Sequence, residues 1–263
     1  MRYFFHISFK GTHFSGWQRQ RMGVVSVQEV LENALQKVTG LQISVMGCGR
    51  TDSGVHASQF FAHFDAETMP DVNKLNFTLP DSIVVHEVIP VSNEAHARYD
   101  AISRTYNFLF HTLKNPYNSE LSTYLNSPIL YPDRMTEACQ WIKDTQDFRG
   151  FCKTPERHNT TLCEITECHW HFSPENSMVF TITANRFLKS MVRILAQDLI
   201  DLGNGVITAT EFKSRLAGNR VGQINKIAYP QGLYLSKVVY KSNVFGRQME
   251  AVVSPGLSSF HNI

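Results

Sequence analysis

One stretch organises the rest of the sequence, Gly49-Arg50-Thr51-Asp52-Ser53-Gly54-Val55-His56-Ala57. It is polar and bracketed by glycines, and it lies between two apolar runs, residues 43–46 and 60–64, that predict short strands. The sequence therefore predicts that Asp52 lies on a tight loop between buried strands. An extended backbone would point Arg50 and Asp52 the same way, and a guanidinium beside an acid favours the ionised acid. A carboxylate held in this way can act as a nucleophile.

Two other interpretations of this stretch stay open from the residues alone. Asp-Ser-Gly is a common turn, because Asp and Ser bond their own backbone and Gly accepts a positive φ. The same triplet is the core of the aspartic protease signature, whose chemistry needs two carboxylates that share one proton. The sequence contains one such triplet, so an aspartic hydrolase would have to pair two copies of it across a dimer.

Composition restricts the class of protein. The 263 residues are 43% apolar and 18% charged, which fits a soluble globular protein of one large domain or two ordinary ones. No run approaches the roughly 18 uninterrupted apolar residues of a membrane span, and the first residues enter a strand pattern, so we expect a cytoplasmic location. Residues 1–100 carry 8 Lys/Arg against 10 Asp/Glu, and the remainder 17 against 13. Any RNA-binding surface must therefore be a local patch.

The cysteines do not indicate a disulfide framework, because their number is odd and their spacing irregular: Cys48, Cys139, Cys152, Cys163 and Cys168. Four potential zinc ligands fall within nine residues, namely Cys163, Cys168, His169 and His171. The C-x-x-C pair of a zinc ribbon is missing, however. We therefore expect buried thiols on a strand and no metal.

Residue periodicity predicts strands and amphipathic helices in both parts of the chain. The first part is expected to contain strands at 2–10 and 83–89, a helix from the capping box Ser26–Glu29 to Gly40, and a helix at 70–78. The second part is expected to contain strands at 103–110, 161–172, 177–185 and 232–240, a loop or insertion at 112–130, and helices at 133–145, near Phe187 and after Thr208. The sequence thus predicts an α+β protein with two similar halves, residues 1–100 and 101–263.

The nine residues from Gly49 to Ala57 closely resemble the signature loop of the tRNA pseudouridine synthase A family. Other segments resemble further motifs of that family: Gly11-Thr12 with Gly16-Trp17-Gln18, Ala101-Ile102-Ser103-Arg104-Thr105-Tyr106, Asp147-Phe148-Arg149-Gly150-Phe151, Asn185-Arg186-Phe187-Leu188-Lys189-Ser190-Met191-Val192-Arg193, and Ala228–Leu235. The resemblance covers residues 2 to 240. It implies two ferredoxin-like halves around a central antiparallel sheet, with a cleft between them.

The resemblance implies an isomerase that converts uridine to pseudouridine at positions 38, 39 and 40 of the tRNA anticodon stem-loop. It assigns the nucleophile to Asp52 and the partner of that carboxylate to Arg193. Tyr106 is expected to stack on the uracil and could move a proton. Arg50 is the candidate for base flipping, because the target base must leave the stack. No cofactor is needed for this reaction.

Two cationic segments are expected to bind the RNA. The loop after the first strand can follow phosphates with Arg19 and Arg21 while Trp17 packs beneath it or stacks on a base. Arg186 and Lys189 share one face with Arg193 if the helix begins near Phe187. The family acts as a homodimer on tRNA, and we expect the same partners here. A catalytically silent tRNA-binding protein of the same fold is the remaining alternative.

Overall fold

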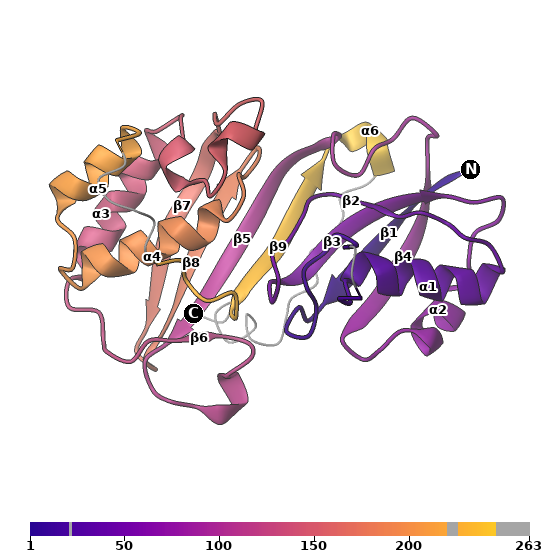
Figure 1. Cartoon of the computed structure of the whole chain (residues 1–263), viewed down its shortest axis with the longest axis horizontal. Coiled ribbons are helices and arrows are strands. Elements are labelled where there is room, and N and C mark those ends of the chain that lie inside the picture. The colour runs from indigo at the N-terminus through magenta and orange to yellow at the C-terminus, as the bar shows by residue number, and fades with distance from the viewer. Residues whose placement is uncertain (21–22, 220–225, 246–263) are drawn as a thin grey trace. The chain divides into compact units, whose positions relative to one another are not determined.

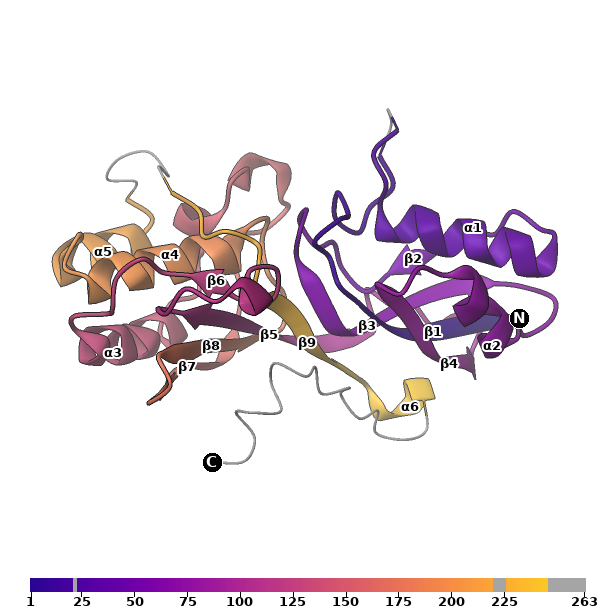
Figure 2. The same ribbon diagram turned by 90° about the horizontal axis from the view of Figure 1, so that it is seen from below.

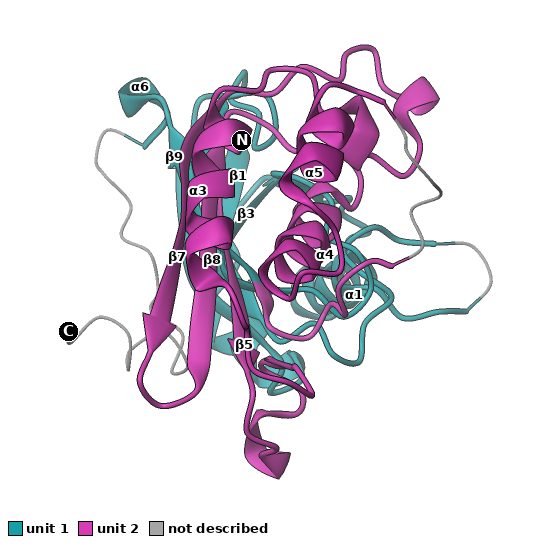
Figure 3. Cartoon of the chain, turned by 90° about the vertical axis from the view of Figure 1, so that its left-hand side faces the viewer, with its two compact units in different colours: residues 1–104, 234–263 teal, residues 105–233 magenta. Residues whose placement is uncertain are grey.

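The computed structural model describes residues 1–20, 23–219 and 226–245 of the chain. The chain forms two compact units, shown in different colours in Figure 3. Unit 1 comprises residues 1–104 and the chain from residue 234, and unit 2 comprises residues 105–233. Each unit combines sheet strands with helices, so the predicted α+β class is confirmed. Among the described residues, no helix has both the length and the apolar character needed to cross a bilayer.

The strands of unit 1 follow the order β4-β1-β3-β9, and β2 pairs with β3. β1 is antiparallel to β3 and β4, whereas β9 is parallel to β3, so the sheet is mixed rather than wholly antiparallel. The elements are β1 (Arg2–Phe9), α1 (Val27–Thr39), β2 (Met46–Gly47), β3 (His56–Asp65), α2 (Val72–Thr78), β4 (Ile83–Val91), β9 (Leu233–Tyr240) and α6 (Ser242–Phe245).

The first helix, α1, begins and ends where the sequence predicts. The Ser26 hydroxyl accepts a hydrogen bond from the Glu29 amide, and Gly40 ends the helix with a φ of 75°. The helix buries Leu31 and Leu35 against the sheet, one face of which it covers (Figure 2). It also contacts α2, which packs on β4.

Both faces of the unit 1 sheet carry aromatic side chains, because neighbouring residues of a strand point to opposite faces. On one face, the rings of Phe5 and Phe64 lie 4.3 Å apart. On the other, Phe61 meets Tyr240 edge to face at 5.3 Å. All four side chains are buried, so the sheet forms the centre of this unit's core.

Unit 2 has the strand order β5-β8-β7, with β6 parallel to β5 and β7 antiparallel to β8. Helix α3 packs on β7 and contacts both α4 and α5 (Figure 1). The elements are β5 (Ala101–His111), whose first residues, 101–104, belong to unit 1, β6 (Thr123–Tyr124), α3 (Pro132–Lys143), β7 (Ile165–Ser173), β8 (Ser177–Ala184), α4 (Met191–Gly203), α5 (Ala209–Leu216) and the 3-10 turns Pro116–Asn118, Arg149–Phe151 and Pro155–Arg157.

A partly buried ion pair joins two helices of unit 2. Arg215 of α5 donates to the Asp198 carboxylate of α4 at 2.6 Å. Burial raises the pKa of Asp198, and the hydrogen bond from Arg215 opposes that rise. At the N-terminus of α5, Thr208 and Glu211 form the predicted capping box with both reciprocal bonds present.

The strand predicted at 43–46 is shorter than expected, since β2 contains only Met46 and Gly47. The backbone of Val45 bonds to side chains of α1 instead of to a neighbouring strand. Its amide donates to Glu32 Oε1 at 3.0 Å, and its carbonyl accepts from Gln28 Nε2 at 3.0 Å. Long-range hydrogen bonds of this kind leave no periodic pattern in the sequence.

The helix predicted to begin near Phe187 begins at Met191. Ser190, directly before it, has a φ of 59°, which is the left-handed conformation and ends any helix arriving from the N-terminal side. The closing strand, β9, joins the sheet of unit 1. Tyr234 and Leu235 of β9 pair with His56 and Ala57 of β3, which places β9 in unit 1.

Candidate active site

The signature loop leaves the sheet at the end of β2 and re-enters it at the start of β3. Gly47 pairs with Ala62, and the Cys48 amide donates to the Phe61 carbonyl at 2.8 Å. Residues 49–55 therefore form the excursion, and His56 is back in the sheet. Burial raises the pKa of the Cys48 thiol to about 11, so this thiol stays protonated beside the loop at neutral pH.

The connection between β1 and α1 hydrogen-bonds to the backbone of the signature loop. The Trp17 amide donates to the Thr51 carbonyl at 3.2 Å. The Phe14 carbonyl accepts from the Gly54 amide at 3.2 Å and from the Ser53 hydroxyl at 3.2 Å. These bonds join the residues on both sides of Asp52 to a second loop, so the backbone around the carboxylate is fixed by protein groups.

The two loops approach so closely that glycine is required at their contact. A Cβ at Gly16, whose φ is +89°, would lie 2.5 Å from the Thr51 carbonyl oxygen. A Cβ at Gly11 would lie 2.0 Å from the Val55 carbonyl oxygen. The Gly11 amide also donates to His56 Nδ1 at 3.0 Å. The glycines of residues 11–18 thus form the support against which the signature loop packs.

Trp17 packs beneath the loop and offers almost no surface to RNA. Its side chain is 2% exposed and stacks on Phe60 at a centroid distance of 4.2 Å. A Cβ at Gly47 would lie 2.5 Å from the indole ring, so β2 is packed directly on it. Of the two positions expected for Trp17, the structure therefore shows the supporting one.

Asp52 and Arg50 lie on the outer part of the loop. Asp52 is partly exposed, and its carbonyl accepts from the Val55 amide at 3.2 Å, which closes a tight turn through Gly54. The Arg50 side chain is exposed. The loop thus holds a partly exposed carboxylate on a well-bonded backbone, with an exposed cation two residues before it.

Arg19 is exposed but is engaged by α1. Its guanidinium forms an ion pair with Glu32 at 3.1 Å, and its amide donates to Gln28 Oε1 at 2.9 Å. Glu32 also holds the Val45 amide, so one buried carboxylate links the β1–α1 connection and the segment before β2 to the helix. Arg21, the other cation expected in this segment, lies outside the described residues.

In unit 2, Arg193 lies in the first turn of α4, where its guanidinium is held by the backbone before β9. Its Nε donates to the Ala228 carbonyl at 2.8 Å, and the Ala228 amide donates back to the Arg193 carbonyl at 3.3 Å. Tyr106 on β5 is partly exposed and meets Phe187 edge to face at 5.1 Å.

Arg186 and Lys189 do not share a helix face with Arg193, because both precede α4. The prediction of a single cationic helix stripe is therefore wrong. Lys189 is exposed, and its carbonyl accepts from the Lys153 amide at 3.3 Å. Arg186 is partly exposed and lies close enough to Cys163 that its charge opposes the effect of burial, which raises the pKa of that thiol to about 11.

The sequence comparisons agree with the motifs. A family model described as tRNA pseudouridine synthase matches residues 138–241. A tRNA pseudouridine synthase A of Bacteroides fragilis is 37% identical over 249 residues, 93% of this chain and 98% of the relative. Those of Parabacteroides distasonis and Porphyromonas gingivalis are 37% and 36% identical, each over 93% of this chain and over 98% and 99% of the relative. The chain belongs to the tRNA pseudouridine synthase A family.

Membership of the tRNA pseudouridine synthase A family confirms the resemblance drawn from the motifs and, at family level, the prediction of an isomerase. It also argues against the aspartic hydrolase interpretation of Asp52-Ser53-Gly54. The individual roles expected for Asp52, Tyr106, Arg193 and Arg50 stay predictions.

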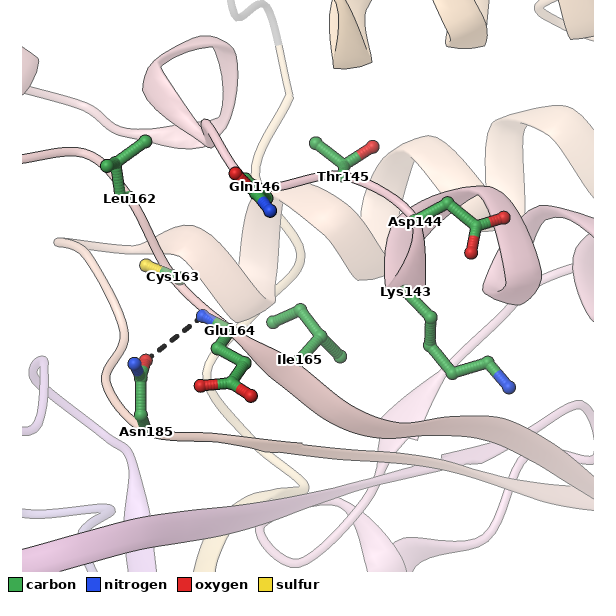
Figure 4. A pocket seen from close by; sticks show the side chains of 9 residues that line it. All are labelled: Lys143, Asp144, Thr145, Gln146, Leu162, Cys163, Glu164, Ile165 and Asn185. Atoms are coloured by element: carbon green, nitrogen blue, oxygen red, sulfur yellow. Dashed lines mark hydrogen bonds between the residues drawn. The ribbon is translucent and has the colours of Figure 1, made fainter.

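A cavity of about 310 Å³ in unit 2 contains none of the side chains predicted to act in this family (Figure 4). The Glu164 amide donates to Asn185 Oδ1 at 3.1 Å at its edge, next to the motif that ends at Arg193. Its lining mixes both charges with amides and apolar groups: Lys143, Asp144, Thr145, Gln146, Leu162, Cys163, Glu164, Ile165 and Asn185.

The five cysteines are free and buried. The prediction of a buried thiol on a strand is met by Cys168 on β7, whereas Cys163 lies before that strand. A hydrogen bond with Cys139, together with burial, raises the pKa of the Cys168 thiol. Among the described residues, no three His, Cys, Asp or Glu side chains gather in a group that could hold a metal ion.

The contact between the two loops predicts a difference between glycine substitutions. Gly16→Ala adds both a left-handed backbone penalty and a clash with the Thr51 carbonyl, whereas Gly40→Ala, at a φ of +75° with nothing within 4 Å, adds only the first. We expect Gly40→Ala to lower the free energy of unfolding by about 1 kcal/mol and Gly16→Ala to lower it clearly more. Urea denaturation of both variants measures the difference. Equal losses would show that the loops tolerate a methyl group at their contact.

Proposed function

We propose that the protein converts uridine to pseudouridine at positions 38, 39 and 40 of the tRNA anticodon stem-loop, with Asp52 as nucleophile. The N1–C1′ bond breaks and a C5–C1′ bond forms. The proton lost from C5 is balanced by one gained at N1, so substrate and product contain the same atoms. The reaction therefore needs neither an energy source nor a redox partner.

The observation that carries this proposal is the fixed backbone around a partly exposed carboxylate. Residues on both sides of Asp52 are hydrogen-bonded to Phe14 and Trp17, and Gly16 packs against Thr51. A nucleophile on such a loop is already oriented when the substrate arrives, which lowers the entropic cost of reaction. Asp52 attacks either C1′ of the ribose or C6 of the base.

A uridine in the anticodon stem must leave the base stack before Asp52 can reach it. Extrusion costs a few kcal/mol, and a side chain that fills the vacated space offsets part of this cost. We assign this role to Arg50, because it is exposed and two residues from the carboxylate on the same loop.

Family resemblance assigns two roles to unit 2. Arg193 would stabilise the Asp52 carboxylate through a charge-assisted pair. The bond from its Nε to the Ala228 carbonyl suits this role, because it fixes the plane of the guanidinium. Tyr106 would stack on the extruded uracil, and its partly exposed ring, set on edge against Phe187, is compatible with that.

The cations expected at the RNA surface are Arg19, Arg21, Arg186 and Lys189. Among the described ones, Lys189 and Arg19 are exposed, and the Glu32 partner of Arg19 is buried. Trp17 acts as support for the loop. We further propose a cytoplasmic homodimer, whose mass light scattering after gel filtration would report.

The central test compares Asp52→Asn with Asp81→Asn, an exposed carboxylate outside the signature loop. We expect Asp52→Asn to lower the rate of pseudouridine formation by at least about 10³-fold, because the amide cannot replace the nucleophile. Arg193→Met should also slow the reaction, and Asp81→Asn should not. Tritium release from tRNA labelled at uracil C5, with carbodiimide mapping, measures both rate and position. Full activity of Asp52→Asn would contradict the proposed mechanism, and tRNA binding without turnover by the unmodified protein would favour the silent binding protein.

Substitutions at Tyr106 separate stacking from proton transfer. We expect Tyr106→Phe to keep its affinity for tRNA, because the ring remains, and to lose about 10²-fold in rate, because the hydroxyl is gone. Tyr106→Leu should lose affinity as well. Filter binding and single-turnover rates measure the two quantities. A Phe variant with an unchanged rate would restrict Tyr106 to stacking.

Substitutions at two exposed cations, Lys189 and Arg50, should affect different steps of the reaction. Lys189→Ala is expected to weaken tRNA binding and to reduce the slope of affinity against salt by about one charge, with the bound-state rate unchanged. Arg50→Ala should instead slow the reaction, and more on a paired uridine than on an unpaired one, because only the paired base must be extruded. Equal slowing on both substrates would contradict the base-flipping role.

A further inference from the structure

The motif that contains Tyr106 also contains Arg104, and the Arg104 side chain contacts the start of the signature loop. Its Nη2 donates to the Cys48 carbonyl at 3.0 Å and to the Arg98 carbonyl at 2.7 Å. Its Nη1 donates to the Ala101 carbonyl at 3.0 Å. One guanidinium thus binds three backbone carbonyls that come from two separate segments of unit 1.

The Cys48 carbonyl lies where the signature loop leaves the sheet. Cys48 is the last residue before the excursion whose amide bonds to β3, through the Phe61 carbonyl. The next residue, Gly49, has no atom within 4 Å of the position its Cβ would occupy. The ladder bonds of this strand therefore end at Cys48, four residues before Asp52, and the side of Gly49 where a Cβ would lie is open.

The rest of the loop, from Thr51 onward, is held differently. Thr51, Ser53 and Gly54 all bond to the connection between β1 and α1, and Gly11 and Gly16 pack against it. These contacts hold Thr51, directly before Asp52, and Ser53 and Gly54 after it. The stretch from Cys48 to Arg50, where the loop leaves β2, lies outside this set of bonds. At the start of that stretch Arg104 binds the Cys48 carbonyl, in addition to the ladder bond made by the Cys48 amide.

Only an arginine side chain can make this set of bonds. The guanidinium presents five donors in a rigid plane, whereas a lysine ammonium is a single point with flexible reach. Arg104 is partly buried, and carbonyl acceptors around its charge replace the water it loses.

We propose that Arg104 is a positioning residue for the isomerisation: by holding the Cys48 carbonyl, it sets the start of the signature loop and hence the place of Asp52. This inference rests on the proposed function, in which Asp52 is the nucleophile. A displacement of about 1 Å at a reacting group can cost 10²-fold in rate, so the bond has a measurable kinetic consequence.

Arg2 provides a matched control in the same unit. Its Nη1 donates to the Ala95 carbonyl at 3.0 Å, and its other nitrogens pair with Asp65 at 2.9 Å. It therefore also binds a backbone carbonyl near the end of β4, but none in the signature loop. Loss of Arg2 removes comparable hydrogen bonds without releasing the Cys48 carbonyl.

The experiment compares Arg104→Met, Arg104→Lys, Arg2→Met and Asp52→Asn in the full-length protein. Single-turnover rates on tRNA at saturating protein report the chemical step, filter binding reports tRNA affinity, and thermal unfolding reports folding. We expect Arg104→Met to lose at least about 30-fold in rate with affinity within threefold. Arg104→Lys, which keeps the charge and can reach one carbonyl, should recover part of the rate, and Arg2→Met should keep it.

The outcomes separate this inference from the proposed function. A folded Arg104→Met protein with the parental rate, or equal rate losses in Arg104→Met and Arg2→Met, would overturn the positioning role. An active Asp52→Asn protein would overturn the proposed function itself. If Arg104→Met does not fold, Arg104→Lys decides. A reduced rate at parental stability and affinity supports the role, and a parental rate in this variant overturns it.

Discussion

The structure of the candidate site depends on the contact between two backbone segments, the signature loop and the connection that follows β1. The Thr51 carbonyl lies 2.5 Å from where a Cβ at Gly16 would be, so only glycine permits this approach. At this distance the peptide groups satisfy each other: Trp17 donates to Thr51, and Gly54 donates to Phe14. Their hydrogen bonds do not depend on water, and the loop can keep one conformation while its acid faces outward.

This constraint explains why motifs that are distant in the sequence belong together. The segment at residues 11–18 packs against the signature loop, and the loop ends at the start of β3. That start is held in turn by β9, because His56 pairs with Tyr234 and stacks on its ring at 4.6 Å. The Gln59 side chain adds a second link by accepting from the Val238 amide at 2.8 Å. Three separate motifs therefore describe one physical assembly in unit 1.

Sequence reasoning succeeded where the determining interactions are local. The caps at Ser26, Gly40 and Thr208 depend on bonds within four residues, so the helices they bound could be predicted. It failed where residues far apart in the sequence determine the local structure. Glu32 accepts the hydrogen bond of the Val45 amide, so this amide does not pair with a neighbouring strand. Ser190 has a left-handed backbone conformation, so α4 begins at Met191 and not near Phe187. The burial of Trp17 is a further example, because no local pattern shows that β2 and Phe60 will enclose an indole from a loop.

The arginines in this chain also show why residue type alone did not reveal their roles. Arg104 and Arg193 both donate to backbone carbonyls, a use that the residue type alone does not predict. For Arg193 this bond orients a guanidinium, and for Arg104 it holds a peptide at the edge of the loop. Both uses depend on the rigid plane of the guanidinium, because its N–H donors point in fixed directions relative to one another. Where an acid must be placed accurately, the backbone that bears it has to be fixed first, and arginine can do this without introducing a second carboxylate nearby.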